Sequence, residues 1–441
     1  MYVYTFVPRG KLYLYTAGFE LLSYYRGNFR SLDVRDSYKL SRFFICHRRA
    51  HRLKTMANTN LANAKTAKND EFYTQYHDIQ TEINAYLDYN PDVFRGKTVL
   101  LPCDDPEWSN FTKFFAQNFE LLGLKKLIST SYAPESKKYK NYQPTLFETS
   151  QPYFDDDKSK THGKIFVLDH DANANGRIDH DDLQWQYLDS DGDFRSNEIC
   201  KLRDEADIIV TNPPFSLFRE FVSWIMDAGK QFLIIGNMNA ITYRDIFALI
   251  KNNLAWLGAT GFVSDMVFGV PEGTIVKESD KAKAERLGYI GNYTRLGNSC
   301  WFTNIDHGRR HQPIKLMTQT EIFKHSKHKD IVERKSFRHY ENFDAIDIPY
   351  TDVIPIDYEG VMGVPISFMD KYCPEQFEII WRSGDIEWCE NECNFFTPPS
   401  NEKAISYKKQ DRTWRVQNPY VVDEQGYANT VYQRIFIRKK Q

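Results

Sequence analysis

Four consecutive residues, Asn212-Pro213-Pro214-Phe215, combine the groups needed to hold and stack a planar amino compound. The amide oxygen of Asn212 and the carbonyl oxygen of Pro213 can accept both hydrogens of an amino group, which aims its nitrogen lone pair at an incoming methyl group. The two prolines restrict the backbone and so hold these carbonyls rigidly. Phe215 offers a flat face on which an extruded base can stack. The tetrapeptide indicates chemistry at a planar nitrogen, with a proline-rich turn as the structural alternative.

A methyl donor must bind beside these residues, and two acidic segments can receive it. Asp104 and Asp105 follow a predicted strand, where carboxylates suit an ammonium group or hydroxyls. The loop that they open contains no glycine, so the usual glycine-rich loop after the first strand is missing. Nearer to the tetrapeptide, Asp193 can accept from an adenine amino group, while Phe194 can offer its backbone N–H and pack its ring. Ordinary turn acids are the structural alternative.

Alternating strand and helix patterns must position these residues. Apolar runs predict buried strands, and amphipathic spacing predicts helices. The predicted strands cover 97–102, 125–131, 206–211 and 230–236, and the predicted helices cover 78–87, 109–122, 217–226 and 243–251. This alternation is typical of an α/β fold with a parallel sheet, which binds ligands at the carboxyl ends of its strands. The tetrapeptide directly follows one such strand and precedes a helix.

The chain divides into parts of different composition. Residues 1–55 are rich in tyrosine and poor in acids, so we expect an N-terminal extension that is disordered or a mis-assigned start, and we expect a chain that begins at Met56 to fold alone. A basic targeting arm is the alternative for this extension. Residues 56–263 form the predicted catalytic domain, with a polar insertion at 133–188. Residues 264–441 contain short β-like runs and many aromatic residues, which predict a second, mixed α/β domain.

The net charge of -2 conceals a basic segment. Between Arg309 and His339 the chain gathers these basic residues: Arg309, Arg310, His311, Lys315, Lys324, Lys327, Lys329, Arg334, Lys335 and Arg338. A nucleic-acid-binding protein needs only one basic face, because phosphate neutralisation is local. We therefore expect DNA phosphate contacts from this segment, with Arg309, Arg310, Lys327 and Arg334 as candidates. A solvated helix face is the alternative.

Composition argues against several other classes. With 441 residues, 41% of them hydrophobic, the chain can bury a sizeable core. No apolar run reaches the ~20 residues of a membrane span, and the first residues lack a signal-peptide pattern. Seven scattered cysteines are too few for a disulfide scaffold and fit a reducing compartment, so we expect a cytoplasmic protein without membrane contact.

Two patterns could suggest a metal, but we expect none. Cys389 and Cys393 have no second pair at zinc-finger spacing. The stretch 171–182, from Asp171 to Asp182, has oxygen ligands at the spacing of a calcium loop, but the usual terminal glutamate is an aspartate and no convincing helix precedes it. We favour a polar β-turn there over calcium binding.

Several longer segments resemble the EcoRI-type adenine-specific DNA methyltransferases. They include Asn-Asp-Glu-Phe-Tyr-Thr-Gln-Tyr at 69–76, Cys-Asp-Asp-Pro at 103–106 with Ser-Asn-Phe at 109–111, Leu-Gly-Leu-Lys-Lys-Leu at 122–127, Gly-Asp-Phe-Arg-Ser at 192–196, Val-Thr-Asn-Pro-Pro-Phe-Ser-Leu-Phe-Arg-Glu at 210–220 and Gly-Val-Met-Gly-Val-Pro at 360–365. The motifs are long and in the same order as in that family. The resemblance runs from about residue 64 to at least Phe377 and does not cover 1–55 or 133–188.

The resemblance implies a Rossmann-like sheet that binds S-adenosylmethionine and a C-terminal target-recognition domain. It also implies a monomer that acts on double-stranded DNA by base flipping. By position, Phe72, Tyr73 and Thr74 are similar to the segment that closes over the methionine end of the donor. Asp104 and Asp105 occupy the first donor-binding motif of the family, and Asp193 with Phe194 the adenine-binding one. The missing glycine loop is shared with this family.

We therefore predict a site-specific methyltransferase that transfers a methyl group to adenine N6 in duplex DNA. It would act in restriction-modification, beside a cognate endonuclease, or as an orphan methylase. Methylation of cytosine N4, an RNA base or a protein glutamine is the alternative within enzymes. A DNA-binding module without catalysis is the alternative from another class. The recognition sequence does not follow from the residues, because base-edge geometry decides it.

Overall fold

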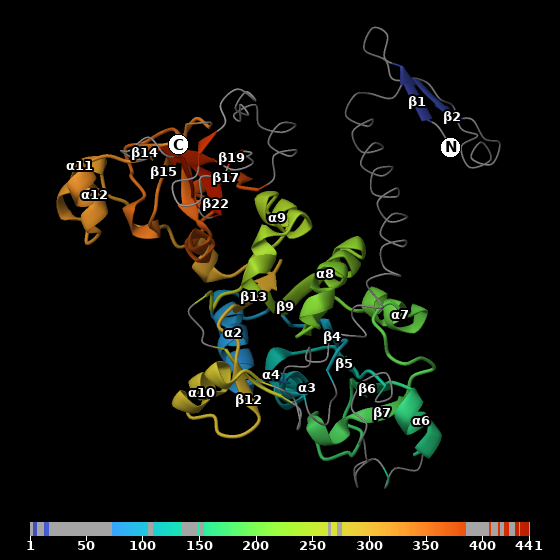
Figure 1. Ribbon diagram of the computed structural model, residues 1–441. Coiled ribbons are helices and arrows are strands. Elements are labelled where there is room, and N and C mark those ends of the chain that lie inside the picture. Colours follow the sequence, from blue (N-terminus) through green and yellow to red (C-terminus); the bar gives the residue numbers. More distant parts are fainter. Residues whose placement is uncertain are drawn as a thin grey trace. The chain divides into compact units, whose positions relative to one another are not determined.

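The computed structural model describes residues 73–104, 109–133, 154–262, 266–270, 276–341, 343–384, 419–422, 428–431 and 433–440, with a few short segments elsewhere (Figure 1). The chain forms two compact units, Met1–Lys68 and Asn69–Gln441. Within the first unit only β1 (Val3–Phe6) and β2 (Tyr13–Thr16) are described, and they pair antiparallel. The expectations for residues 1–55 therefore lie almost wholly outside the described residues.

An eight-stranded sheet forms the centre of the second unit. In spatial order its strands are β10 (Trp256–Leu257), β13 (Ser299–Thr303), β9 (Gln231–Asn237), β8 (Ile208–Thr211), β4 (Thr98–Leu101), β5 (Lys126–Thr130), β6 (Lys164–Leu168) and β7 (Gln184–Tyr187). The four central strands, β9, β8, β4 and β5, run parallel to one another. The outer strands, β10 and β13 on one side and β6 and β7 on the other, are paired antiparallel. The α/β class is confirmed, with a mixed sheet in place of the parallel one.

Helices cover both faces of this sheet because its central strands are apolar on both sides. Leu100 and Ile209 face one core cluster, which holds residues of α7, α8 and α9, while Val99 and Ile208 face a second, which holds residues of α2, α3 and α4. The helices are α2 (Tyr76–Tyr89), α3 (Asn110–Gln117), α4 (Phe119–Leu122), α6 (Asp156–Thr161), α7 (Asn197–Glu205), α8 (Phe218–Asp227) and α9 (Arg244–Lys251). Full burial on both faces is what continuous apolar runs predict. None of the described helices is long and apolar enough to cross a membrane.

The predicted helix over 109–122 is interrupted. It divides into α3 and α4 at Asn118, whose side-chain Nδ2 donates to the carbonyl of Phe114 at 2.8 Å. An asparagine that bonds to the preceding turn competes with the helical pattern. The phenylalanines of both helices, Phe111, Phe114, Phe115 and Phe119, are nevertheless buried.

The polar insertion over 133–188 contains two strands that the sequence patterns did not predict. Residues 134–148 lie outside the described residues, but 164–168 and 184–187 form β6 and β7, which extend the sheet beyond β5. β7 alternates exposed and buried side chains and presents Trp185 to the interior. The alternation is short and the surrounding sequence is polar, which concealed both strands.

The central sheet takes strands from both sides of the expected domain boundary at residue 263. β13 is contributed from beyond that boundary and pairs with β9 along five residues inside the central sheet. A three-stranded sheet likewise joins β11 (Val267–Gly269) and β12 (Tyr293–Arg295) to β3 (Tyr73–Thr74). Helix α10 (Glu278–Arg286) lies between β11 and β12 in the chain. The central sheet therefore includes residues as far as Thr303, because strands that are distant in the sequence pair within it.

The remaining chain builds a five-stranded sheet with two short helices. The strands in spatial order are β14 (Arg338–His339), β15 (Ala345–Asp347), β16 (Val361–Pro365), β22 (Arg434–Lys439) and β17 (Phe377–Arg382), and the helices are α11 (Gln319–His325) and α12 (Lys329–Arg334). Short 3-10 helices complete the described elements: η2 (His180–Asp182), η3 (Phe215–Leu217), η4 (Met238–Thr242), η5 (Gly308–His311), η6 (Thr351–Val353) and η7 (Ile366–Lys371). Two small hairpins pair β18 (Ile405–Ser406) with β19 (Thr413–Trp414), and β20 (Tyr420–Val422) with β21 (Ala428–Thr430). A second, mixed α/β region is thus present.

Buried polar contacts join this region to the central sheet. The carboxylate of Glu82 on α2 accepts from Thr260 N at 2.8 Å and Thr260 Oγ1 at 2.6 Å. Arg309 Nη1 donates to Thr260 O at 3.0 Å, and its Nη2 lies 2.8 Å from Asp370 Oδ2 on η7. Asp370 also accepts from Phe262 N at 2.8 Å. Burial raises the pKa of Glu82, although hydrogen bonds from Thr260 oppose that shift.

A close approach of two backbone segments fixes the loop at 190–194 against the end of β5. Ala133 N donates to Asp191 O at 2.8 Å, and Gly192 adopts a φ of 82°. A Cβ added at Gly192 would overlap the carbonyl oxygen of Ser131. Glycine is therefore required there both by the backbone conformation and by the space.

We predict that Gly192→Ala destabilises the protein more than Gly176→Ala does. Gly176 has a similar φ of 84° but no atom within 4 Å of an added Cβ, so it isolates the backbone cost of about 1–2 kcal/mol. Gly192→Ala should lose about 1–3 kcal/mol more from steric overlap. Urea unfolding of both variants measures the difference. Equal losses would contradict the close packing of 190–194 on Ser131.

Candidate functional site

The site lies where β4 and β8 end side by side. These strands are parallel neighbours, so the loops that follow them leave the same edge of the sheet. Asp104 follows β4, and Asn212 follows β8. Two of the expected functional segments are therefore brought together by the sheet.

The carboxylate of Asp104 connects the two strand ends directly. Asp104 is only 7% exposed, and its Oδ2 accepts a hydrogen bond of 2.7 Å from Thr211 Oγ1. Its Oδ1 accepts from Ser109 Oγ at 2.8 Å. The backbone is held as well, because Asp104 N donates to Thr130 O at 3.0 Å and Ser129 Oγ donates to Asp104 O at 2.6 Å. The loop after β4 is thus anchored to β5, to β8 and to α3.

The start of α3 extends this connection to β3. Ser109 caps the helix by accepting from Phe111 N at 3.1 Å, and Asn110 Nδ2 donates to Thr74 O at 2.8 Å. Thr74 is 4% exposed and pairs with Phe268 of β11. The Tyr73-Thr74 segment, expected near the donor, therefore lies beside the helix that follows Asp104. Phe72 and Asp105 lie outside the described residues.

The tetrapeptide makes a tight transition from strand to helix. Leu217 N donates to Pro214 O at 2.9 Å, which closes the turn that begins η3. Asn212 is partly exposed although its Oδ1 atom is buried, and Pro213 is buried. Phe215 is partly buried against the core cluster that contains α2 and α3.

The helix after the tetrapeptide starts close to the sheet because of a glycine. Phe218 begins α8, and its ring lies against Gly236 of β9, where an added Cβ would overlap it. Phe218 also packs against Phe302 of β13, with ring centroids 5.0 Å apart. These apolar contacts fix the direction in which the chain leaves the tetrapeptide.

Asp193 and Phe194 have different surroundings. Asp193 Oδ1 accepts from Arg195 N and Nε, both at 2.8 Å, while Arg195 Nη2 lies 2.5 Å from Asp193 Oδ2. Arg195 Nη1 also approaches Glu220 of α8 at 3.4 Å. Phe194 is 5% exposed and its ring meets that of Phe221 at 5.1 Å. The side chain of Phe194 thus packs in the core, and Asp193 is ion-paired at its edge.

Two acidic side chains, Asp193 in the loop at 190–194 and Asp78 on α2, have shifted pKa values. Burial alone would raise the pKa of Asp193, but hydrogen bonds from Arg195 outweigh it and hold the pKa below its usual range. At the start of α2, burial raises the pKa of Asp78 to about 6, although the neighbouring His77 opposes the shift. The negative charge of Asp193 is thus already balanced by Arg195.

The four basic candidates differ in their accessibility. Arg310 is 8% exposed, and its guanidinium lies 3.6 Å from the ring centroid of Trp256 and near Asn253 and Asp306. Arg309 is engaged in the junction with Thr260 and Asp370. The Lys327 side chain is 76% exposed and 3.0 Å from Asp352, and that of Arg334 is 28% exposed and 3.7 Å from Asp330. Lys327 is the most exposed of the four, whereas Arg309, whose side chain is 31% exposed, and Arg334 are both half-buried.

The sequence motifs include the residues that hold the site together, but no role was predicted for them. Thr211, Ser109 and Asn110 bond to Asp104 or Thr74, and Arg195 pairs with Asp193. Ser109 carries a recognisable signal, since serine before an aromatic helix is a typical N-cap. The other three lie next to residues that were singled out, but their partners are distant in the sequence.

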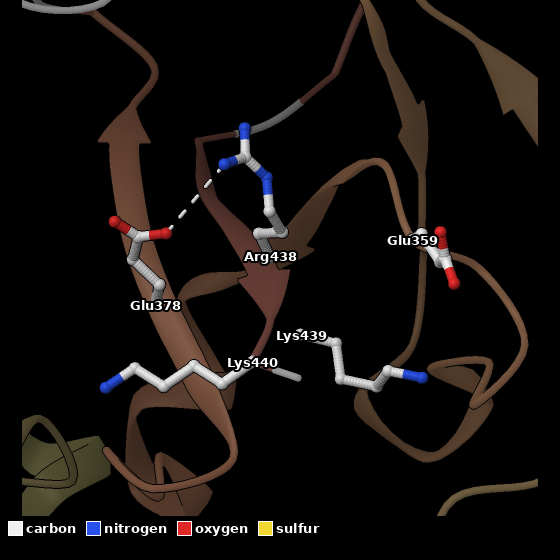
Figure 2. A pocket seen from close by; sticks show the side chains of 5 residues that line it. All are labelled: Glu359, Glu378, Arg438, Lys439 and Lys440. Carbon is white, nitrogen blue, oxygen red and sulfur yellow. Dashed lines mark ion pairs between the residues drawn. The ribbon is translucent and has the colours of Figure 1, made fainter.

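A cavity of about 570 Å³ lies outside this site, on the five-stranded sheet. Figure 2 shows its lining, in which Arg438 pairs with Glu378 at 3.9 Å. Glu359, Lys439 and Lys440 complete it. Its mixed charge and lack of apolar lining side chains give it no link to the chemistry of the tetrapeptide.

Within the described residues, no group of three or more His, Cys, Asp or Glu side chains could hold a metal ion. In the loop over 171–182, Asp182 Oδ1 accepts from Ala172 N and Asn173 N, both at 3.0 Å, and Gly176 N donates to Asp171 Oδ2 at 2.7 Å. These oxygens bond to the loop's own backbone. Cys389 and Cys393 lie outside the described residues.

Comparison with known proteins adds to this geometry. The chain matches the family described as "Adenine-specific methyltransferase EcoRI" over residues 60–440. The Type II methyltransferase M.EcoRI of Escherichia coli is 39% identical over 333 residues, which cover 75% of this chain and 91% of that protein. The Type II methyltransferase M.MpnI of Mycoplasma pneumoniae is 32% identical over 318 residues, or 72% of this chain and 83% of its own length. The Type II methyltransferase M.MgeORF184P of Mycoplasma genitalium is 31% identical over 319 residues, which cover 72% of this chain and 84% of that protein.

No solved structure matches the chain. The family match begins before β3 and reaches the last strand, β22. It therefore includes the eight-stranded sheet, the five-stranded sheet and every described segment of the site. It confirms the resemblance that the motifs indicated and extends it beyond Phe377. The chain belongs to the EcoRI family of adenine-specific DNA methyltransferases.

Proposed function

We propose that this methyltransferase transfers a methyl group from S-adenosylmethionine to the N6 atom of adenine in double-stranded DNA. Asn212 is the residue that carries the proposal, because it directly follows a fully buried strand at the edge where Asp104 also lies. Its amide oxygen and the carbonyl of Pro213 accept the two hydrogens of the adenine amino group. The nitrogen lone pair would then point toward the methyl group, the S–C bond would break with its electron pair going to sulfur, and the methylated nitrogen would release one proton.

Pro214 and Phe215 complete the target site in this proposal. Pro214 has a φ of -53° and accepts from Leu217 N, so it holds the turn in which the carbonyls are presented. Phe215 stacks on the base once the base has left the duplex, which offsets part of an unstacking cost of a few kcal/mol. Base flipping is required because N6 of a paired adenine is occupied by its partner base.

The residues at the strand ends fit a donor of this chemistry. S-adenosylmethionine supplies a methyl group on a positively charged sulfonium, beside an ammonium group, ribose hydroxyls and an adenine amino group. Asp104 and Asp193 provide acceptor oxygens, and the loop at 190–194 is held against β5 by the close contact of Gly192 with Ser131. We propose a Rossmann-like donor site there, bordered by Phe72, Tyr73 and Thr74, with Asp105 on the same loop as Asp104. Phe194, whose side chain packs in the core, helps to position this donor site.

We further propose that the region after Thr303 recognises the DNA sequence. The central sheet is used by the donor and the target base, so discrimination has to come from other parts of the chain. Lys327 and Arg334 are proposed phosphate contacts because their side chains reach solvent. Arg309, through its ion pair with Asp370, and Arg310, through its contact with Trp256, help to hold this region in place. The enzyme would act as a monomer, beside a cognate restriction endonuclease or as an orphan methylase.

The substrate class is tested by incubating the protein with labelled donor and, separately, duplex DNA, RNA or protein. We expect label only on adenine N6 of DNA. Sequencing of a methylated genomic DNA would then read the modified positions. Label on cytosine, RNA or a protein amide would contradict the proposal.

We predict that Asn212→Ala abolishes methyl transfer but leaves the Kd for donor nearly unchanged. The amide acts on the target amino group and not on the donor. Asn252→Ala, which removes an exposed asparagine at the end of α9, is the control and should be fully active. Turnover and donor titration calorimetry measure the two effects. Loss of donor binding by a folded Asn212→Ala protein would refute this assignment.

We predict that Lys327→Gln weakens binding to all DNA sequences about equally and lowers the salt dependence by about one unit. Each phosphate contact releases roughly one counterion, so its loss reduces the slope of log K against log salt. Lys160→Gln is the control, because Lys160 pairs with Asp156 at 2.8 Å on an exposed helix much as Lys327 pairs with Asp352. Fluorescence anisotropy at several salt concentrations measures both. An unchanged slope would make the α11–α12 segment a solvated face.

A further inference from the structure

The hydroxyl of Thr211 occupies a position that the methyl-transfer chemistry does not itself explain. Thr211 is fully buried, is the last residue of β8 and directly precedes Asn212. Its Oγ1 donates to Asp104 Oδ2 at 2.7 Å, between residues 107 positions apart in the chain. A strand interior is normally apolar, so a buried threonine bonded to a buried carboxylate at this point calls for a reason beyond packing.

Asp104 also links the end of β8 to the segment that is proposed to bind the donor. Its second oxygen accepts from Ser109, the N-cap of α3, and the next residue, Asn110, donates to Thr74 O on β3. The path from Thr74 to Asn212 therefore consists of hydrogen bonds of 2.7 to 2.8 Å joined by single peptide units. One end of the path is the proposed donor segment, and the other is the proposed target-base residue.

We propose that Thr211 is a positioning residue that couples the donor site to Asn212 through the carboxylate of Asp104. This inference rests on the proposed function and refines it. With both carboxylate oxygens of Asp104 accepting from side chains, its main role is to hold the loop after β4 and the end of β8 in register. A donor bound against Tyr73, Thr74 and this loop then stabilises the same arrangement that directs Asn212 toward the target amino group.

Thr211→Val tests the coupling because valine keeps the branched shape and removes only the hydroxyl. We expect kcat to fall roughly tenfold, since a hydrogen bond to a charged group is worth about one such factor or more. We also expect the Kd for S-adenosylmethionine to rise several-fold, although Thr211 is not proposed to touch the donor. Thr211→Ser restores the hydroxyl and should recover both values.

Thr303→Val is the matched control. Thr303 ends β13 of the same sheet, is fully buried, and its Oγ1 donates to Phe232 O at 2.7 Å. It should lose similar stability but keep kcat and donor affinity. Asn110→Ala gives an independent probe at the partly exposed start of α3, and we expect it to weaken donor binding. It keeps the coupling testable if Thr211→Val does not fold.

Donor titration separates the failure of this inference from that of the proposed function. If Thr211→Val binds donor and turns over like Thr303→Val, the coupling is wrong while the proposed function stands. The same holds if Thr211→Ser fails to restore the losses, or if Asn110→Ala leaves donor affinity unchanged. The wild-type protein could bind donor without methylating adenine, while Thr211→Val still weakens donor binding. That result would overturn the proposed target base but would support the connection between Thr211 and the donor site. A wild-type protein that binds no donor would overturn both.

Discussion

The buried carboxylate of Asp104 is the interaction on which the arrangement of the site depends. Parallel pairing sets β4 and β8 about 4.8 Å apart but does not fix the turns that follow them. Asp104 fixes those turns by accepting from Thr211 and Ser109. A buried charge is tolerated only with such donors, because its desolvation costs several kcal/mol. The same bonds that make Asp104 acceptable in the interior therefore also define the geometry at the strand ends.

The basic segment between Arg309 and His339 serves two physical roles. Its first residues face inward, where Arg310 stacks on Trp256 and Arg309 bridges Thr260 and Asp370. Its later residues lie on the short helices α11 and α12 and in the link between them, where the side chain of Lys327 reaches solvent. Arg309 and Arg310 thus hold the C-terminal region on the central sheet, while exposed residues such as Lys327 supply positive charge. The charge pattern alone does not separate these roles, since both need the same residue types.

Apolar periodicity predicted the central strands and their flanking helices well, because burial on both faces leaves a continuous signal in the chain. It failed where the signal depends on contacts that are distant in sequence. β6 and β7 occur in a polar stretch, and β13 joins the sheet from beyond the expected boundary. Besides its positive φ, Gly192 is required by the nearby carbonyl of Ser131, which lies 61 residues earlier in the chain.

The sequence by itself determined the α/β class, the family and the tetrapeptide that follows β8, since long local motifs encode them. It also indicated that acids lie at the ends of the strands. Only the tertiary structure decided what those acids contact: Asp104 meets Thr211 and Ser109, while Asp193 meets Arg195. The physical reason is that strand order and loop closure, which no local pattern contains, choose the hydrogen-bond partners of a buried carboxylate.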